Sequence, residues 1–300
     1  MAPRVVAVVT GAYLLNPALI FESAYWGQTA AVHTVFMLLA LIAADQRFYA
    51  VCGAAFGAAI LTKPQALAIA PLLFVLTWRD KALVKFCAAA FIAAVFITLP
   101  FLVTGNIDGV VTQYLNTTEY HPVLSANAHN LWWLVSGGHS WKPDTFSSGG
   151  VSFRTIGLSL FLASSILSGA LVWRNRNALF FAAAYQSLAF FMLNTQIHEN
   201  HALPMFVFLV VAAATFEPIG WYFYGGFAIT TLANMALHDP NLIRSFGHPR
   251  PLRFVNATAQ LLLFGLYTYC LIDPRTRRWM GKLFNKSDSS CSSASSCNNS

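Results

Sequence analysis

Apolar runs occupy most of this 300-residue chain, and charged residues make up only 10% of it. A helix needs about 20 apolar residues to cross the hydrocarbon core of a bilayer, and roughly ten runs approach that length. They lie near 4–21, 30–44, 48–62, 66–78, 86–104, 153–173, 178–193, 202–216, 221–237 and 254–272. Soluble domains carry about 25% charged residues, so an aqueous core cannot hide this much apolar surface. The sequence therefore predicts an all-α polytopic membrane protein with about ten transmembrane helices.

Two helical parts flank one long segment that is rich in polar and aromatic residues. The predicted divisions are a five-helix transmembrane part over 1–104, an outer loop over 105–152, a second five-helix transmembrane part over 153–272, and a disordered cytoplasmic tail over 273–300. Within the loop, Val110–Leu115 and Leu131–Val135 are predicted to lie as short interfacial helices in the headgroup layer. The Ser- and Asn-rich tail has too few apolar residues to form a core.

The basic residues predict the orientation of the chain. With the N-terminus in the cytoplasm, 12 of the 18 Lys and Arg residues fall on the inner side and 6 on the outer side, as the positive-inside rule requires. The same orientation places the 8 histidines at or near the outer face. We therefore expect an N-in/C-in integral membrane protein. Because the net charge of +7 is spread between the apolar runs, nucleic-acid binding is not expected.

The first of four polar clusters at the predicted outer face begins at Glu22 and continues through Tyr25, Trp26 and Gln28 towards His33. An aromatic belt at the headgroups explains Tyr25 and Trp26. A belt does not require a carboxylate and an amide beside it, so a functional role is favoured.

The second cluster is Lys63 and Gln65, between two apolar runs. A lysine at a helix end ordinarily reaches to phosphate headgroups. A lysine beside a glutamine also suits the binding of a lipid phosphate by charge and hydrogen bond, and both interpretations stay open.

The third cluster combines Asn127, His129 and Asn130 with Trp132 and Trp133. Indole rings cover the apolar face of a sugar ring while amides reach its hydroxyl groups, so this combination favours a sugar site. The alternative is an interfacial helix with capping asparagines.

The fourth cluster is His198, Glu199 and His201 at the end of an apolar run. A glutamate between two histidines can exchange protons or hold a cation, and the alternative is a capped helix end. The spacing differs from H-E-x-x-H and offers no third ligand, so no metal site is predicted.

Together these motifs follow a familiar order along the chain. They are Asn16-Pro17-Ala18 leading into Tyr25-Trp26-Gly27-Gln28, then Thr62-Lys63-Pro64-Gln65, then the segment 127–133, then His198-Glu199. This order resembles the GT-C integral-membrane glycosyltransferases that use polyprenyl-phosphate sugars. The likeness covers residues 14–205, and it is closest to prokaryotic mannosyltransferase-like members and to the ER dolichyl-phosphate-glucose glucosyltransferases.

The resemblance implies transfer of a hexose, mannose or glucose, from a polyprenyl-phosphate carrier to a lipid-linked glycan or another acceptor on the outer or lumenal face. The departing phosphate needs positive charge, and the acceptor hydroxyl needs a carboxylate as general base. The expected catalytic residues are Glu22, Glu199 and His198. The expected substrate-binding residues are Trp26, Gln28, Lys63, Gln65, Asn127, His129, Asn130, Trp132 and His201. The donor is the lipid-linked sugar, and a divalent metal ion is compatible with this chemistry.

The chain departs from the family pattern in three places. Relatives often carry an aspartate just after W-G-Q, where this chain has Thr29, Ala30 and Ala31, and a basic residue after His-Glu, where it has Asn200. The family also begins with one or two helices and an outer loop that bears the catalytic carboxylate, and this chain starts after that point. We therefore expect the sequence to lack those N-terminal helices; otherwise Glu22 or Glu199 replaces the base, or the chain is inactive.

The competing interpretations are a transporter or flippase of lipid-linked glycans, a truncated inactive relative, and a membrane scaffold without enzymatic activity. A transporter predicts polar residues at the bilayer midplane, and the apolar runs hold hardly a charge there. The sequence Asn116-Thr117-Thr118 would accept a glycan only in a eukaryotic secretory membrane. The short loops and the lack of a retention signal favour a prokaryotic plasma membrane over the ER membrane.

Overall fold

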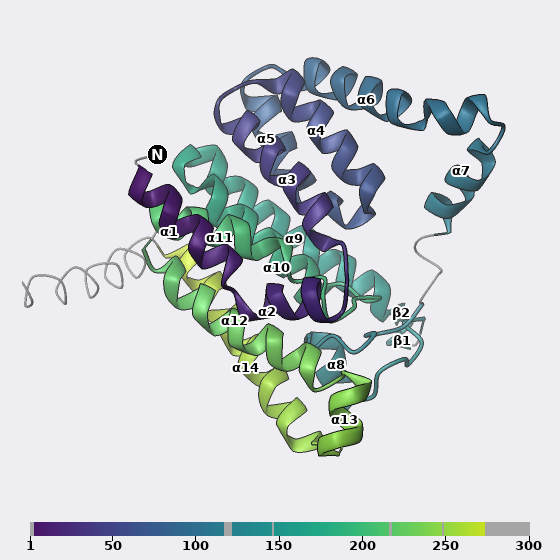
Figure 1. Cartoon of the computed structure of the whole chain (residues 1–300), viewed down its shortest axis with the longest axis vertical. Coiled ribbons are helices and arrows are strands. Elements are labelled where there is room, and N and C mark those ends of the chain that lie inside the picture. The colour runs from purple at the N-terminus through teal and green to yellow at the C-terminus, as the bar shows by residue number, and fades with distance from the viewer. Residues whose placement is uncertain (1–2, 117–121, 146, 216–217, 248, 274–300) are drawn as a thin grey trace, which may run out of the picture.

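The computed structural model of the chain is almost entirely helical (Figure 1). It describes residues 3–116, 122–145, 147–215, 218–247 and 249–273, so the predicted tail beyond Asp273 and residues Thr117 and Thr118 lie outside the described part. The first elements are α1 (Pro3–Leu14), α2 (Pro17–Ile20), a π-helical turn (Phe21–Tyr25), α3 (Ala30–Asp45), α4 (Tyr49–Thr62), a 3₁₀ helix (Pro64–Ile69), α5 (Ala70–Arg79), α6 (Leu83–Val103), α7 (Ile107–Leu115) and α8 (Leu131–Val135). The chain continues with β1 (Ser147–Ser148), β2 (Val151–Ser152), α9 (Phe153–Arg174), a 3₁₀ turn (Arg176–Ala178), α10 (Leu179–Leu193), α11 (Pro204–Thr215), α12 (Gly220–Ala236), α13 (Pro240–Phe246) and α14 (Arg250–Ile272).

Every predicted apolar run forms a helix, a bent pair of helices, or a 3₁₀ segment continued by a helix. Among the described residues, α6, α9 and α14 are long and apolar enough to cross a membrane, which is consistent with an integral membrane protein. The pair Pro3–Leu14 and Pro17–Tyr25, bent by 50°, makes a fourth if it is counted as one span. Ten transmembrane helices are therefore not confirmed. The remaining runs fall short because a helix rises about 1.5 Å per residue and the hydrocarbon core is about 30 Å thick.

The centre of the bundle is formed by α10 and α11. Every residue of α10 except Phe190 is buried, and so are ten residues of the 12-residue α11. A helix that is apolar on all sides must be covered on all sides. Here α9, α11 and α14 pack around α10, so other helices, rather than lipid, cover this predicted span.

A close approach of two backbones holds α6 to the rest of the molecule. Gly53 and Gly57 lie one turn apart on α4 and face the backbone of α6 at Phe86 and Ala90. Phe86 is the one buried residue of α6. Small residues four apart allow such an approach between helices in membranes.

The predicted outer loop contains two different helices. On α7 no residue is buried, and the Tyr114 hydroxyl donates to the carbonyl of Ile60 at 3.0 Å, at the end of α4. On α8, by contrast, Trp132 and Trp133 are buried at 2% and 1% exposure, because α8 packs against α10 and α14. One face of α8 is therefore covered by the bundle, while Val135 is 51% exposed, and the position of this segment in the headgroup layer stays a prediction.

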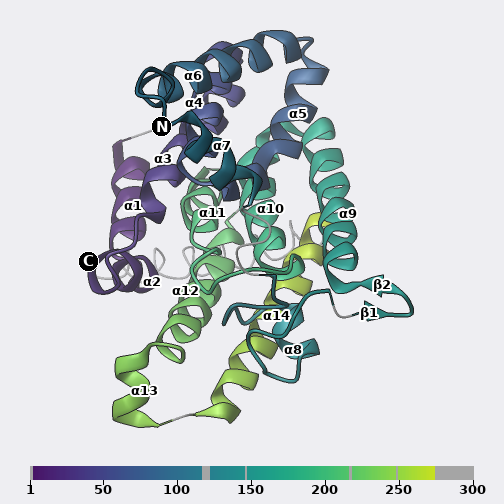
Figure 2. The ribbon, with the colours of Figure 1, turned by 90° about the vertical axis from the view of Figure 1, so that its right-hand side faces the viewer.

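The helices form an elongated molecule with α3 to α6 at one end and α13 at the other (Figures 1 and 2). Contacts run between the two predicted helical parts: α1 packs against α11, α2 against α12, and α5 against α9. The α3–α6 end is fastened by Asp80, which binds Arg176 at 2.8 Å and Arg79 at 3.1 Å and also accepts a hydrogen bond from Tyr49. Polar segments that are far apart in the sequence also meet, as where the Gln65 side chain donates to the His201 carbonyl.

Candidate functional site

Glu22 lies in the π-helical turn that follows a break in the first apolar run. Asn16 and Pro17 make this break, because the Asn16 Oδ1 atom accepts from the Ala18 N–H at 2.9 Å and Pro17 begins the next helix. The Asn16 Nδ2 atom donates to the Tyr224 hydroxyl on α12 at 2.9 Å. The break is therefore set by local sequence and fixed to the opposite half of the bundle.

The Glu22 carboxylate is buried, at 2% exposure. Its Oε1 atom accepts from the Ala30 N–H at 3.3 Å, and the residue lines a cavity of about 180 Å³. Most of the cavity wall is apolar, with polar side chains from Tyr13, Ser23 and Thr34. A carboxylate in such a wall needs a hydrogen bond or an opposite charge.

Lys63 is a cation close enough to interact electrostatically with Glu22. It sits on extended backbone between α4 and the 3₁₀ helix and is half-buried. Burial lowers the pKa of Lys63, and the negative charge of Glu22 acts in the opposite direction. The first and second predicted clusters therefore interact electrostatically in the folded protein.

Gln65 links these clusters to the loop that joins α10 and α11. Its Nε2 atom donates to the main-chain carbonyl of His201. Burial lowers the pKa of His201 well below its ordinary value, and the neighbouring Lys63, His198 and His33 lower it further, so His201 is neutral at pH 7. Clusters one, two and four thus share one neighbourhood.

Glu199 lies in the same loop. Burial raises its pKa, and a hydrogen bond from its own backbone acts against that rise. The Oε2 atom is 3.9 Å from Nδ1 of His198, whose ring centroid is 5.5 Å from that of His201. A carboxylate with a raised pKa is suited to proton transfer near neutral pH.

This neighbourhood concentrates buried polar atoms that have no hydrogen-bond partner. Nine such side-chain atoms occur in the described part of the chain, and five of them are here: both ring nitrogens of His33, Oε1 of Gln65, Oε2 of Glu199 and Nδ1 of His201. Buried polar groups are nearly always hydrogen-bonded. Since these atoms come from three separate segments, ordered water or a bound group with several hydrogen-bonding atoms would satisfy them.

The third predicted cluster reaches this neighbourhood only through its backbone. Ala126 and Asn127 pair with His198 in isolated β-bridges, and Asn127 adopts a left-handed φ of 66°. The Asn127 carbonyl accepts from Nδ2 of Asn234 on α12 at 2.8 Å. The side chains that follow Asn127 point into the bundle.

The polar side-chain atoms of Asn130 and Trp132 all form hydrogen bonds within the bundle. The Asn130 Oδ1 atom caps α8 by accepting from the Trp133 N–H at 3.0 Å, and its Nδ2 atom donates to the Phe191 carbonyl at 3.1 Å. The Trp132 indole donates to the Leu193 carbonyl at 2.6 Å. These bonds leave the Trp132 nitrogen unavailable to a sugar.

His129 forms a buried pair with His238 at the end of α12. Their Nε2 atoms are 3.1 Å apart, and Nδ1 of His129 accepts from Nδ2 of Asn256 at 2.7 Å. The Asn256 amide also donates to the Thr230 carbonyl, so its orientation is fixed and the His129 proton is assigned to Nε2. His129 therefore donates to His238, and both rings are neutral.

Trp26 and Gln28 directly follow the π-helical turn in the chain, and Trp26 is its C-cap residue. Gln28 is exposed, and its backbone N–H donates to the Glu22 carbonyl at 3.1 Å. The Trp26 indole donates to Oδ2 of Asp239 at 2.8 Å. The sequence reasoning missed Asp239, because an aspartate before Pro240 is typical of an ordinary helix N-cap.

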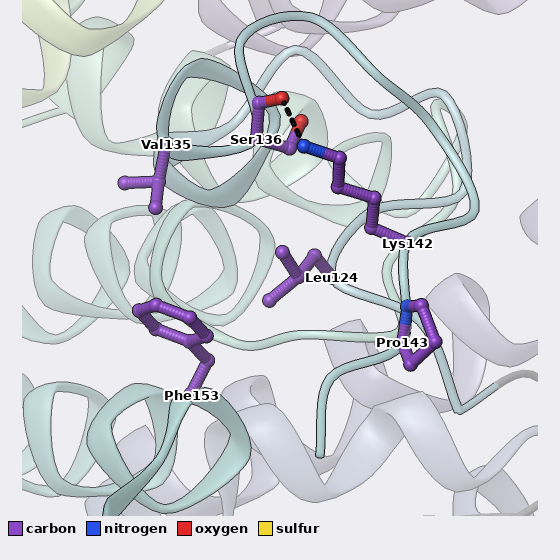
Figure 3. A pocket seen from close by; sticks show the side chains of 6 residues that line it. All are labelled: Leu124, Val135, Ser136, Lys142, Pro143 and Phe153. Carbon is purple, nitrogen blue, oxygen red and sulfur yellow. Dashed lines mark hydrogen bonds between the residues drawn. The ribbon is translucent and has the colours of Figure 1, made fainter. Parts of the chain in front are cut away.

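Another cavity adjoins α8 and α9 and includes none of the predicted site residues (Figure 3). Its volume is about 330 Å³, and its walls are mainly apolar, as the labelled Leu124, Val135 and Phe153 show. Lys142 at its edge donates to the Ser136 carbonyl at 3.1 Å. Lys142 is the one titratable residue among the residues that line this cavity, and no carboxylate stands beside it there.

The site therefore combines a half-buried lysine, the buried carboxylate of Glu22, the partly buried carboxylate of Glu199 and neutral imidazoles, which can bind an anion and move a proton. Within the described ranges, no group of three or more His, Cys, Asp or Glu side chains is arranged to hold a metal ion. Comparison of the sequence with models of protein families and with curated proteins finds no match in either case.

Proposed function

We propose that this chain is a membrane glycosyltransferase that moves a hexose from a polyprenyl-phosphate carrier to a lipid-linked glycan or another acceptor. The observation that supports this proposal best is the group of five unpartnered polar atoms beside Lys63 and Glu22. A sugar phosphate carries many hydroxyl and phosphate oxygens in a small volume. It would therefore give hydrogen-bond partners to several of these atoms at once.

In the proposed reaction, Glu22 is the general base. It takes the proton from the acceptor hydroxyl while the hydroxyl oxygen bonds to the anomeric carbon, and the bond from that carbon to the phosphate oxygen breaks. The polyprenyl phosphate leaves with the electron pair, and Lys63 stabilises its charge. His201 donates a hydrogen bond, while His198 and Glu199 hold or exchange a proton beside it.

The proposed setting is the outer face of a prokaryotic plasma membrane, with an N-in/C-in chain. The excess of basic residues around Asp80 favours the cytoplasmic side for that end of the molecule. To test this orientation, a single cysteine is introduced at Lys142 or at Lys81 in a cysteine-free chain. A membrane-impermeant maleimide is expected to label only the first in intact cells.

The test of function is hexose transfer by the purified protein in detergent, with radiolabelled polyprenyl-phosphate mannose or glucose as donor and a mixture of lipid-linked glycans as acceptor. Glu22→Gln and Lys63→Ala are each expected to lower the rate at least about 100-fold, as removal of a general base or a charge-stabilising group does. Asp108→Asn and Lys142→Ala are matched controls on exposed residues and are expected to keep the wild-type rate.

Full activity in both site variants would refute the assigned roles. No transfer by the wild-type chain would refute the proposed enzyme. Movement of a lipid-linked glycan across liposomes without covalent transfer would instead establish the transporter.

A further inference from the structure

We propose that Asp239 is a positioning residue for this reaction: its carboxylate holds the Trp26 indole and so fixes the π-helical turn that presents Glu22 to Lys63. This inference rests on the proposed function for its catalytic consequence. The contact itself belongs to the fold and is tested separately below.

The two oxygens of Asp239 have different partners. Oδ2 accepts from the Trp26 indole N–H at 2.8 Å. Oδ1 caps α13 by accepting from the N–H groups of Asn241 at 3.0 Å and Leu242 at 2.9 Å, and it also accepts from the Tyr25 hydroxyl at 3.3 Å. Oδ1 therefore completes the start of α13 and also contacts the π-helical turn through Tyr25, whereas Oδ2 bonds the Trp26 indole.

The carboxylate is buried, at 2% exposure, and it is charged at neutral pH. Burial alone would raise the pKa of Asp239, but the hydrogen bonds from Trp26, Leu242, Asn241 and Tyr25 outweigh burial and lower it. A charged acceptor makes the bond to the indole stronger than a neutral one would.

The turn that Asp239 holds is short and cannot set its own geometry. It consists of Phe21–Tyr25, and the Trp26 N–H closes it by donating to the Phe21 carbonyl at 3.0 Å. Single π-helical turns are uncommon, and they occur frequently at functional sites. Since Glu22 is the second residue of this turn, any rotation of the turn changes the position of its carboxylate.

Asp239 is itself held in place by the residues on either side of it in the chain. Asp239 follows His238, whose ring is bound to His129, and it precedes Pro240 at the start of α13. The backbone N–H of His129 in turn donates to Oδ1 of Asn234 on α12 at 2.8 Å. The segment next to His129 pairs with His198, so Asp239 connects the Glu22 side of the site to the histidine side.

The decisive variant is Asp239→Asn. Its Oδ1 atom can still cap α13, whereas the amide nitrogen replaces Oδ2 and faces the indole N–H, so that two donors meet. We expect kcat to fall about 10- to 100-fold with KM changed less than about threefold, the pattern of a displaced catalytic group with intact substrate binding. The indole ¹⁵N–¹H resonance of Trp26 is expected to move from a hydrogen-bonded to a free position.

A second variant separates positioning from folding. Trp26→Phe removes the indole donor, and combined with Asp239→Asn it removes the conflict between two donors. The double variant is expected to recover part of the kcat lost in Asp239→Asn. Arg244→Ala is the matched control, because its exposed side chain lies on the same helix and leaves the cap and the indole bond in place.

The Trp26 resonance and the kcat of Asp239→Asn each support or refute a separate part of the proposal. An unchanged Trp26 resonance in Asp239→Asn overturns the contact, and a shifted resonance with wild-type kcat overturns the positioning role. If the wild-type chain transfers no hexose, the proposed function and the positioning role both fall. The Trp26 resonance would still report whether Asp239 holds the indole.

Discussion

Replacing Gly53 with alanine tests whether α6 is attached to the bundle by the close approach of two backbones. A methyl group at this position would lie 2.1 Å from the Phe86 carbonyl oxygen and 3.1 Å from the Ala90 nitrogen. Real Cβ atoms essentially never come closer than 3.0 Å to another heavy atom. Because both neighbours are backbone atoms, no side-chain rotation relieves the clash, and α6 must move outward.

The size of the effect follows from that movement. To bring the nearest contact from 2.1 Å to 3.0 Å, α6 must move away from α4 by about 0.9 Å. A gap of that size removes a quarter to a half of the dispersion attraction across the interface. Overpacking of this kind costs about 1–3 kcal/mol, against which alanine gains about 1 kcal/mol over glycine in a helix. The upper end applies here, since α6 buries only Phe86. We expect a net loss of about 2 kcal/mol, which lowers the Tm by about 3 °C in a chain of this size.

The assay is thermal unfolding of the purified protein in detergent, followed by helical circular dichroism and by the monodisperse fraction on size exclusion. Gly265→Ala is the matched control, because a methyl group there meets nothing within 4 Å, and its Tm is expected to stay or rise. Gly57→Ala, with a nearest contact of 2.6 Å, is expected to fall between the two. Equal Tm values for Gly53→Ala and Gly265→Ala would refute the reasoning.

Three further predictions concern the interior. Asn130→Ala removes an N-cap and two buried hydrogen bonds, so it is expected to lower the free energy of unfolding by about 2–4 kcal/mol, measured by thermal unfolding. Burial and Arg253 lower the pKa of His238 to about 3, so the folded protein loses stability as pH falls below about 6.5, by about 2 kcal/mol at pH 5. His238→Gln is expected to flatten this dependence in a pH series of Tm values. Asp80→Asn weakens the bonds to Arg79 and Arg176 and is expected to cost about 2–3 kcal/mol, whereas Asp45→Asn, half exposed, is expected to cost less than about 0.5 kcal/mol by the same measurement.

The positions of the helices could be predicted from the sequence, but the number of spans could not. An apolar run looks the same whether lipid or neighbouring helices cover it. The α10 run is covered by α9, α11 and α14, and only the three-dimensional packing reveals this. The break after Leu14 was visible as Asn16-Pro17, whereas the attachment of α6 through Gly53 and Gly57 was not recognised.

The candidate site could be predicted in part. Glu22, Lys63 and His201 stand out in the sequence as polar residues that interrupt apolar runs, and the structure brings all three into one neighbourhood. Asp239 could not be recognised, because its N-cap role fully explains its place before Pro240 in the sequence. Its second role depends on Oδ2, and the partner of that oxygen is 213 residues away.

The aromatic and amide segment 127–133 shows why composition alone misleads. Tryptophan beside asparagine suits a sugar ring, but the same pair also suits a loop that packs into a bundle, since indole and amide donors satisfy carbonyls at a helix end. Asn130 and Trp132 do this for Phe191 and Leu193. If the proposed transfer occurs, contacts to the sugar therefore come from atoms that still lack partners, namely both ring nitrogens of His33, Nδ1 of His201 and Oε1 of Gln65, rather than from the tryptophan platform.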